Sequence, residues 1–264
     1  MKPTRDDHTA PAGWGAMACG AVLGALGALV AFAPAHWLAA ALAHGSAGHV
    51  LLDDARGTVW DGSARLLLTG GPGSTDRAAL PGRVDWQISL APPQPRVQLH
   101  LPCCAAQPLA VTVTPGVASA RLQLGASALQ LPAAWLSGLG TPFNTLQLGG
   151  SLQLRTQGLD VTLAQGRLRV DGEAELTVAN AVSSLSTLRP LGSYRLQLSG
   201  GDTPRMQLST LDGALRLQGN GQIVGTRLRF DGAASAAPSY EDALGNLLNI
   251  IGRRDGSRSI ISVS

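Results

Sequence analysis

The sequence predicts a mainly β fold: an antiparallel multi-strand roll, sandwich or partly open barrel with a few short helices, preceded by one transmembrane helix. Leucine alternates with arginine or glutamine in many short runs, a pattern typical of an antiparallel sheet with one buried and one solvated face. The 33 glycines and 16 prolines indicate frequent chain reversals, which favour short strands over long helices. A long stretch without charged side chains lies near the N-terminus.

This N-terminal stretch predicts the transmembrane helix. No Asp, Glu, Lys or Arg occurs between Asp7 and Asp53, and most of residues 14–42 are Ala, Gly, Leu or Val. Because about 20 apolar residues span a bilayer, we expect a cytoplasmic tail over 1–13, an anchor region over 14–42 and one β-rich domain over 43–264.

The charges that flank the stretch set its expected direction. Lys2 and Arg5 precede it, so the N-terminus should stay in the cytoplasm. The β-rich domain should then lie in the periplasm of a Gram-negative bacterium, and the protein in the inner membrane. A cleaved signal peptide is the alternative, because Ala31 and Ala33 form an A-x-A pattern. Both alternatives export the β-rich domain.

Alternating runs and the glycine-containing breaks between them define the expected strands. Strands are expected at 97–101, 121–124, 152–155, 167–170, 194–198, 215–218 and 227–230. Hairpin signals are expected at 149–150, 171–172, 200–202, 212–213, 219–221 and 231–232. Strands that recur about every 8 to 12 residues are typical of a sandwich or a partly open barrel.

Two helices interrupt the strands. Residues 131–138 predict a short helix, with Pro132 suited to its first turn, and the span 131–143 could divide the domain into two halves. A second helix is expected over 240–251, with Ser239 as its N-cap. One face of this helix collects the apolar side chains Leu244, Leu247, Leu248 and Ile251. We expect Gly252 to end the helix, Arg253 and Arg254 to complement its negative end, and a last strand over 259–263.

Composition and charge exclude nucleic-acid binding. Only 14% of the residues are charged, the net charge is +3, and Lys2 is the one lysine. The arginines are spread singly along the chain, whereas a nucleic-acid surface needs clustered cations and interleaved aromatics. We therefore expect no nucleic-acid partner.

The chain also lacks the groups that catalysis needs. Four of the five histidines lie at or before His49, which leaves His100 alone in most of the β-rich domain. No phosphate-binding loop, zinc-protease motif, nucleophile elbow or dinucleotide fingerprint is present. We expect no catalytic, cofactor-binding or metal-binding residues, and hence no enzyme.

The three cysteines predict little chemistry. Cys19 lies inside the apolar N-terminal stretch, and Cys103 and Cys104 are adjacent, so on a strand they would point to opposite faces. A disulfide between neighbours is strained, and the spacing does not suit zinc. We expect small side chains in an apolar setting, with a redox or intermolecular role for Cys103 or Cys104 as the alternative.

One short element stands out. Gly-Thr-Val-Trp-Asp-Gly, residues 57–62, places Trp60 between Gly57 and Gly62. Glycine lets the backbone turn sharply, so Trp60 can seal an end of the β core. Trp86, in Gly-Arg-Val-Asp-Trp at 82–86, is expected to be a second core-sealing aromatic.

Taken in order, these residues resemble the type II secretion system protein N family, also called general secretion pathway protein N. The likeness rests on the N-terminal anchor, the element 57–62, the Gly-Arg-x-x-Trp strand at 82–86 and the Leu-Gly-x-Tyr-Arg-Leu strand at 191–196, which holds Tyr194. A Leu-x-Gly strand region, the C-terminal helix and the short last strand complete it, so the resemblance covers essentially the whole chain. The Ala- and Gly-rich anchor and the Cys103–Cys104 pair depart from the family pattern.

The resemblance implies a non-catalytic inner-membrane accessory component of type II secretion. Such a component would assist export of folded proteins from the periplasm across the outer membrane, in contact with the inner-membrane platform or the secretin. The alternative is an anchored β-groove module that binds or conducts lipid across the envelope. In that case the alternating leucines would line an open apolar groove instead of a dry core.

Overall fold

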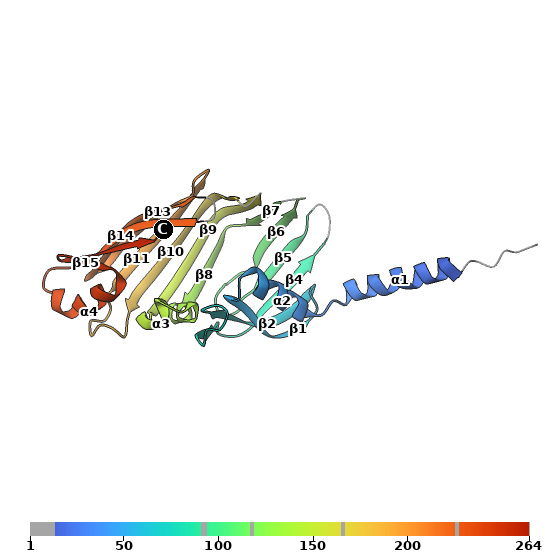
Figure 1. Ribbon diagram of the computed structural model, residues 1–264, viewed down its shortest axis with the longest axis horizontal. Helices are drawn as coiled ribbons and strands as arrows, with labels where there is room; N and C mark the ends of the chain where they lie inside the picture. Colours follow the sequence, from blue (N-terminus) through green and yellow to red (C-terminus); the bar gives the residue numbers. More distant parts are fainter. Residues whose placement is uncertain (1–13, 91–93, 117–118, 165–166, 225–226, 264) are drawn as a thin grey trace, which may run out of the picture.

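The computed structural model describes residues 14–90, 94–116, 119–164, 167–224 and 227–263. One 16-stranded antiparallel sheet runs through them in the order β1-β2-β4-β5-β6-β7-β9-β10-β11-β12-β13-β14-β16-β15, while β3 pairs with β2 and β8 with β9 (Figure 1). The strands are β1 Val50–Gly57, β2 Asp61–Thr69, β3 Arg77–Ala79, β4 Val84–Ser89, β5 Arg96–His100, β6 Leu109–Pro115, β7 Ser119–Leu124, β8 Ser127–Pro132, β9 Gly149–Ala164, β10 Arg167–Val182, β11 Gly192–Gly201, β12 Arg205–Gly213, β13 Leu215–Val224, β14 Arg227–Ala236, β15 Arg253–Asp255 and β16 Arg258–Val263. The helices are α1 Trp14–Ala31, α2 Ala35–Gly45, the 3-10 helix η1 Ala133–Leu139, α3 Phe143–Leu146 and α4 Glu241–Ile251. The mainly β, antiparallel fold class is therefore confirmed.

The transmembrane helix expected over 14–42 is not found. The region forms two helices, α1 and α2, and no helix among the described residues is both long and apolar enough to cross a membrane. The helix is interrupted at Pro34, because proline has no backbone N–H to donate to the preceding turn. Beyond the break, Ala35 is buried against Ala64 and Trp86, so α2 packs on the sheet.

One side of the sheet is apolar because leucines stand opposite one another across neighbouring strands. Leu176 on β10 lies opposite Leu154 on β9 and Leu196 on β11, and Leu196 lies opposite Leu208 on β12. Cross-strand partners point to the same side of an antiparallel sheet. We call this apolar side the inner face and the polar side the outer face.

Helices cover one end of the inner face, where α2, α3 and α4 lie along the same side of the sheet (Figure 1). The expected apolar face of α4 is confirmed, since Leu244, Leu247 and Leu248 are at most 1% exposed. They pack with Tyr194 and Leu215 in one hydrophobic cluster. A second cluster lies near η1, and a third beneath α2. The sheet is continuous across β9, so the span 131–143 does not divide it.

Three expected hairpin breaks lie inside strands: 171–172 in β10, 219–221 in β13 and 231–232 in β14. The last two stay extended because Phe230 fills the space that glycine leaves. A Cβ at Gly219 or Gly232 would lie within 3 Å of the Phe230 ring. The breaks at 200–202 and 212–213 do fall where β11 and β12 end.

The break at 171–172 is instead a bulge. Gly172 has φ +97° and lies so close to the Gly158 carbonyl that a side chain there would collide with it. The register of β10 shifts against β9 between Asp171 and Glu173 and against β11 between Val170 and Glu173. A bulge bends a strand and increases its twist, so β10 continues for 16 residues through a kink.

The C-terminal helix begins one residue later than expected. Tyr240, not Ser239, stands at the N-cap, and no side chain caps the helix. Ser239 has φ +73°, a conformation unlike the extended backbone of an N-cap. Gly252 follows α4 as expected, but Arg253 and Arg254 pair with the last strand as β15 instead of complementing the helix end.

The adjacent cysteines also differ from what the sequence predicts. Cys103 and Cys104 form a disulfide, and they lie in the turn after β5, where the alternation of strand side chains does not apply. The Cys104 side chain is buried beside Leu101 and Leu109, while Cys103 is exposed. The backbone amide of Gln130 donates to the Cys104 carbonyl, which ties this turn to β8.

Candidate functional site at the junction of the N-terminal helix and the sheet

The residues that link α1 to α2 are held by the turn between β1 and β2. The Val59 amide donates to the Ala33 carbonyl over 2.8 Å, and Pro34 forms an isolated β-bridge with Thr58. The Trp60 indole Nε1–H donates to the Val30 carbonyl over 2.7 Å. Val30 belongs to the last turn of α1, whose carbonyls have no partner within the helix. The turn thus caps α1 and fixes the start of α2.

The turn itself depends on its two glycines. Gly57 has φ +85°, and a Cβ there would lie 2.5 Å from the Asp61 carbonyl oxygen. The Thr58 amide donates to that carbonyl, and the Asp61 amide donates to the Thr58 hydroxyl. Gly62 is opposite Gly57 and closes the hairpin.

Trp86 lies beneath this turn, in the core. Its side chain is 3% exposed, and its Nε1–H donates to the Val59 carbonyl over 3.0 Å. Gly62 makes room for it, because a Cβ at Gly62 would lie 2.6 Å from the Trp86 ring. The expected core-sealing role therefore fits Trp86.

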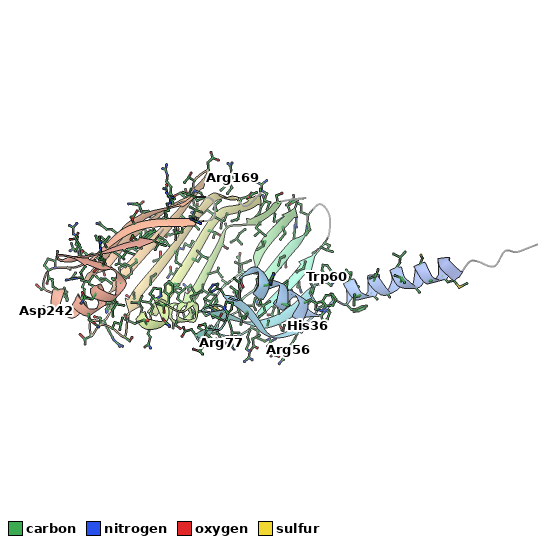
Figure 2. All side chains as sticks on the ribbon, viewed as in Figure 1. His36, Arg56, Trp60, Arg77, Arg169 and Asp242 are labelled. Atoms are coloured by element: carbon green, nitrogen blue, oxygen red, sulfur yellow. A yellow bond between two sulfur atoms is a disulfide. The ribbon has the colours of Figure 1, made fainter. Side chains whose placement is uncertain are left out.

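Trp60 occupies a different environment from the one expected. Its side chain is half-buried beside the C-terminal end of α1 and does not belong to the hydrophobic core (Figure 2). The backbone carbonyl of Trp60 accepts the Ile88 amide, which joins the turn to β4. The indole is therefore placed to hold α1 from the domain side.

Arg83 belongs to the Gly-Arg-x-x-Trp element that contains Trp86, and its role does not follow from the sequence pattern. Its guanidinium donates to the Asp54 carboxylate over 2.8 Å and to the backbone carbonyls of Asp54 and Ser63. Hydrogen bonds from Arg56 and from Arg83 hold the pKa of the Asp54 carboxyl below its usual range. Arg83 thus fastens β4 to the β1–β2 hairpin.

Tyr194 lies apart from the junction, in the cluster beneath α4. Its side chain is 5% exposed, and its hydroxyl donates to the Leu215 carbonyl over 3.0 Å. Burial raises the pKa of the Tyr194 phenol well above its usual value, so the group stays neutral. The five motif residues therefore form two groups: Gly57, Trp60, Gly62 and Trp86 at the junction, and Tyr194 in the C-terminal core.

In the part of the chain that the structure describes, His100 belongs to no metal-binding group. This side chain is exposed on the outer face, opposite Asp85 on the neighbouring strand. Among the described residues, no three His, Cys, Asp or Glu side chains are placed to hold a metal ion. The arrangement at the junction offers backbone and indole hydrogen bonds, which suit a mechanical link between α1 and the sheet.

Comparison with known proteins agrees with this distribution of motifs. The family model of type II secretion system (T2SS), protein N, matches residues 48–261. The matched span starts after α2 and contains both motif groups. Searches of the curated proteins and of the solved structures each returned no match.

Proposed function

The chain belongs to the type II secretion system protein N family, and from this premise we propose that it is a non-catalytic accessory component of that machinery. The N-terminal segment attaches it to the inner membrane. The β-rich domain lies in the periplasm, where it binds other subunits of the inner-membrane platform or the secretin. The family match over most of the chain carries this proposal.

The surface of α1 supports attachment to an apolar medium. Large apolar side chains on α1 and just after it are each more than half exposed: Met17, Val22, Leu23, Leu26, Leu29, Val30 and Phe32. A helix that is apolar all round needs apolar surroundings, which lipid supplies. We propose that this surface lies in the inner membrane, with Lys2 and Arg5 on its cytoplasmic side.

The junction gives this arrangement a mechanical role. Val59 and Trp60 hold the end of α1 through two hydrogen bonds, while Trp86 anchors the same turn in the core. We infer that the link sets the direction in which the β-rich domain leaves the membrane surface. A fixed direction presents the sheet to neighbouring subunits in one orientation.

Topology provides the first test. A reporter that is active only in the periplasm should be active when fused after Gly45 and inactive when fused after Arg5. Activity of the second fusion, or silence of the first, would contradict the topology. A mature N-terminus near Pro34 would show that the segment is a cleaved signal, and membrane attachment through α1 would then be wrong.

Partner recovery provides the second test. The tagged full chain is purified from detergent-solubilised envelopes of a bacterium that carries the type II system. Subunits of the inner-membrane platform or the secretin should be enriched over their level with an unrelated protein carrying the same residues 1–45. Equal recovery from both would contradict a role for the β-rich domain in binding.

One observation favours the lipid-groove alternative. Apolar side chains continue along the inner face beyond the helices, and Leu122, Leu228 and Val263 are 43%, 37% and 50% exposed. If they line a lipid groove, the purified β-rich domain should carry extractable phospholipid in a fixed ratio. Recovery of such lipid without any secretion subunit would favour this alternative over the proposed assembly role.

A further inference from the structure

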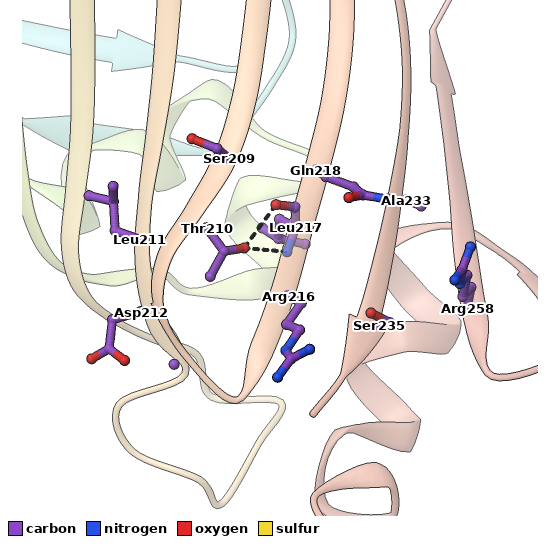
Figure 3. Close-up of a pocket in the computed structure, with 11 residues that line it drawn as sticks. Ser209, Thr210, Leu211, Asp212, Arg216, Leu217, Gln218, Ala233, Ser235 and Arg258 are labelled. Carbon is purple, nitrogen blue, oxygen red and sulfur yellow. Dashed lines mark hydrogen bonds between the residues drawn. The ribbon is translucent and has the colours of Figure 1, made fainter. Parts of the chain in front are cut away.

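Two arginines flank a serine in one row across the outer face. Arg216 on β13 is opposite Ser235 on β14, and Ser235 is opposite Arg258 on β16. The two arginines are two strands apart, about 10 Å, and both are exposed. Figure 3 shows these side chains on their three neighbouring strands. Because the Ser235 side chain is short and the two arginine side chains beside it are long, there is room for a ligand above Ser235.

The sheet opens beside this row. β12 and β13 are paired only from Arg205 with Gln222 to Leu208 with Gly219. Beyond that point the Thr210 hydroxyl replaces the ladder, since it accepts the Leu217 amide and donates to the Leu217 carbonyl (Figure 3). The two strands therefore separate toward their connecting turn.

The separation and the short side chains hollow the outer face. A cavity of about 610 Å³ lies over Ser209, Ala233 and Ser235, with Arg216 and Arg258 at its margin. A second hollow of about 560 Å³ shares Ser209 and Ala233 and continues along β12–β14. We call this continuous depression the trough. Its long direction follows the strands.

A second pair of arginines stands in the next outer-face row beyond the trough. Arg205 on β12 and Arg229 on β14 flank Gln222 on β13 in one row. Gln222 is six positions from Arg216 along β13, a separation of about 20 Å in an extended strand.

The four arginines are available to a ligand. No ion pair found among the described residues involves Arg205, Arg216, Arg229 or Arg258. Asp231, on the middle of β14, is the acidic side chain that lines the second hollow. Asp212 lines the first cavity together with Arg216 and Arg258. Each arginine pair therefore outnumbers the one carboxylate beside it, Asp212 at one end and Asp231 toward the other.

We propose that the trough binds an extended acidic segment of a partner protein, with carboxylates about 20 Å apart and uncharged residues between them. Guanidinium groups bind carboxylates bidentately, which suits the two arginine rows. Asp231 would repel a third carboxylate at the centre. This inference rests on the proposed function in one respect, that the β-rich domain works by binding protein.

The test uses the full chain in detergent and a fluorescent peptide as probe. The peptide is extended and polar, with two glutamates six positions apart, and its matched control carries glutamine at both places. The acidic peptide should bind measurably at about 50 mM salt and more weakly as salt is added, while the glutamine peptide should not. A third peptide with its two glutamates adjacent should bind more weakly than the first.

Charge reversal assigns the site. Arg216→Glu with Arg258→Glu should weaken binding about tenfold, because two exposed pairs are lost, and so should Arg205→Glu with Arg229→Glu. Lysine at the same positions should bind more weakly than arginine but more strongly than glutamate, because it keeps the charge and loses the bidentate geometry. Arg96→Glu, an exposed arginine on β5 outside the trough, is the matched control and should bind as the parent does.

Two results would overturn the inference: equal binding of the acidic and glutamine peptides, or full binding by both charge-reversed variants with circular dichroism unchanged. Binding to anionic lipid vesicles without peptide binding would also overturn it. Platform subunits recovered without peptide binding would leave the proposed function intact. Peptide binding without those subunits would contradict the proposed function alone.

Discussion

Trp60 and Trp86 stand in two of the motif elements but lie in different environments. Trp86 is 3% exposed and packs in the core, whereas Trp60 is half-buried and donates a hydrogen bond to the last turn of α1. Both indoles donate hydrogen bonds at the same turn. Trp86 donates to the Val59 carbonyl of the turn, and Trp60, which belongs to the turn, donates to the Val30 carbonyl of α1. Their substitutions should therefore separate domain stability from the attachment of α1.

We expect Trp86→Ala to destabilise the domain by about 3–5 kcal/mol, as loss of a buried aromatic does. Trp60→Ala should lower the free energy of unfolding by less than about 2 kcal/mol, but it should make the link between α1 and α2 accessible to protease. Urea unfolding measures the first effect, and limited proteolysis at residues 31–35 measures the second. Equal losses of stability would show that Trp60 belongs to the core, as the sequence predicts.

Ionisation of Tyr194 makes the stability of the protein depend on pH in the alkaline range. Burial raises the pKa of the folded-state phenol above its ordinary value of 10.0, so below about pH 10 its contribution to stability is fully present. Above that pH the unfolded chain ionises and the folded chain does not, so stability falls as pH rises. Tyr194→Phe should cost about 1 kcal/mol near pH 8, since the Leu215 carbonyl loses its donor.

The difference between the Tyr194→Phe variant and the parent should therefore shrink near pH 11. Urea midpoints of both proteins at the two pH values measure it. Tyr240→Phe is the matched control, because Tyr240 is 43% exposed. A constant difference at both pH values would mean that the phenol ionises alike in the folded and unfolded chain.

The residues at the junction could be found from the sequence because glycine and tryptophan are distinctive at that spacing. The role of Arg83 could not, since its bonds to Asp54 depend on the register of β1, β2 and β4. Strand alternation does not predict the Cys103–Cys104 disulfide, because both residues lie in a turn, where alternation does not apply.

At the scale of elements, the bulge in β10 shows how glycine shapes the sheet. Gly172 approaches the Gly158 carbonyl with φ +97°, and Gly200 of β11 lies against the same bulge. Glycines from three neighbouring strands thus meet at this bulge. Gly172 predicts a departure from regular strand geometry, but the sequence does not distinguish a hairpin from a bulge, because a glycine with positive φ suits both.

We expect Gly172→Ala to destabilise the protein by about 1–3 kcal/mol through positive φ and the contact with Gly158. Gly245→Ala is the matched control. Gly245 lies inside α4 with open space around it, so alanine should stabilise by about 0.5–1 kcal/mol. Melting temperatures of the two variants should move in opposite directions. A fall in both, or no change at Gly172, would contradict the account of the bulge.

The alternating runs predicted most strands but not their lengths. β13 and β14 run on through 219–221 and 231–232 because Phe230 packs over Gly219, Gly221 and Gly232. That packing joins residues on two strands, and a pattern read along one strand does not contain it. The helix over 240–251 was predicted well, since its apolar face is periodic within one segment.

At the scale of the whole molecule, the sheet has two unlike faces and one attached helix. The inner face is apolar and covered at one end by α2, α3 and α4, and α1 extends away from the sheet beyond β1 (Figure 1). Ion pairs on the outer face occur from β1 to the turn after β11, and none of those found among the described residues involves Arg205, Arg216, Arg229 or Arg258 of β12–β16. Such a division suits a domain that is held at one end and binds a partner at the other.

The most direct measurement is photo-crosslinking in living cells that secrete through the type II system. A photoreactive amino acid replaces Gln218 in the trough, and a second variant carries it at Gln98, an exposed position on β5. We predict that Gln218 forms crosslinks with a platform subunit or the secretin, more strongly than Gln98 does. Absence of any secretion subunit among the adducts of both positions, in cells whose secretion is normal, would contradict the account.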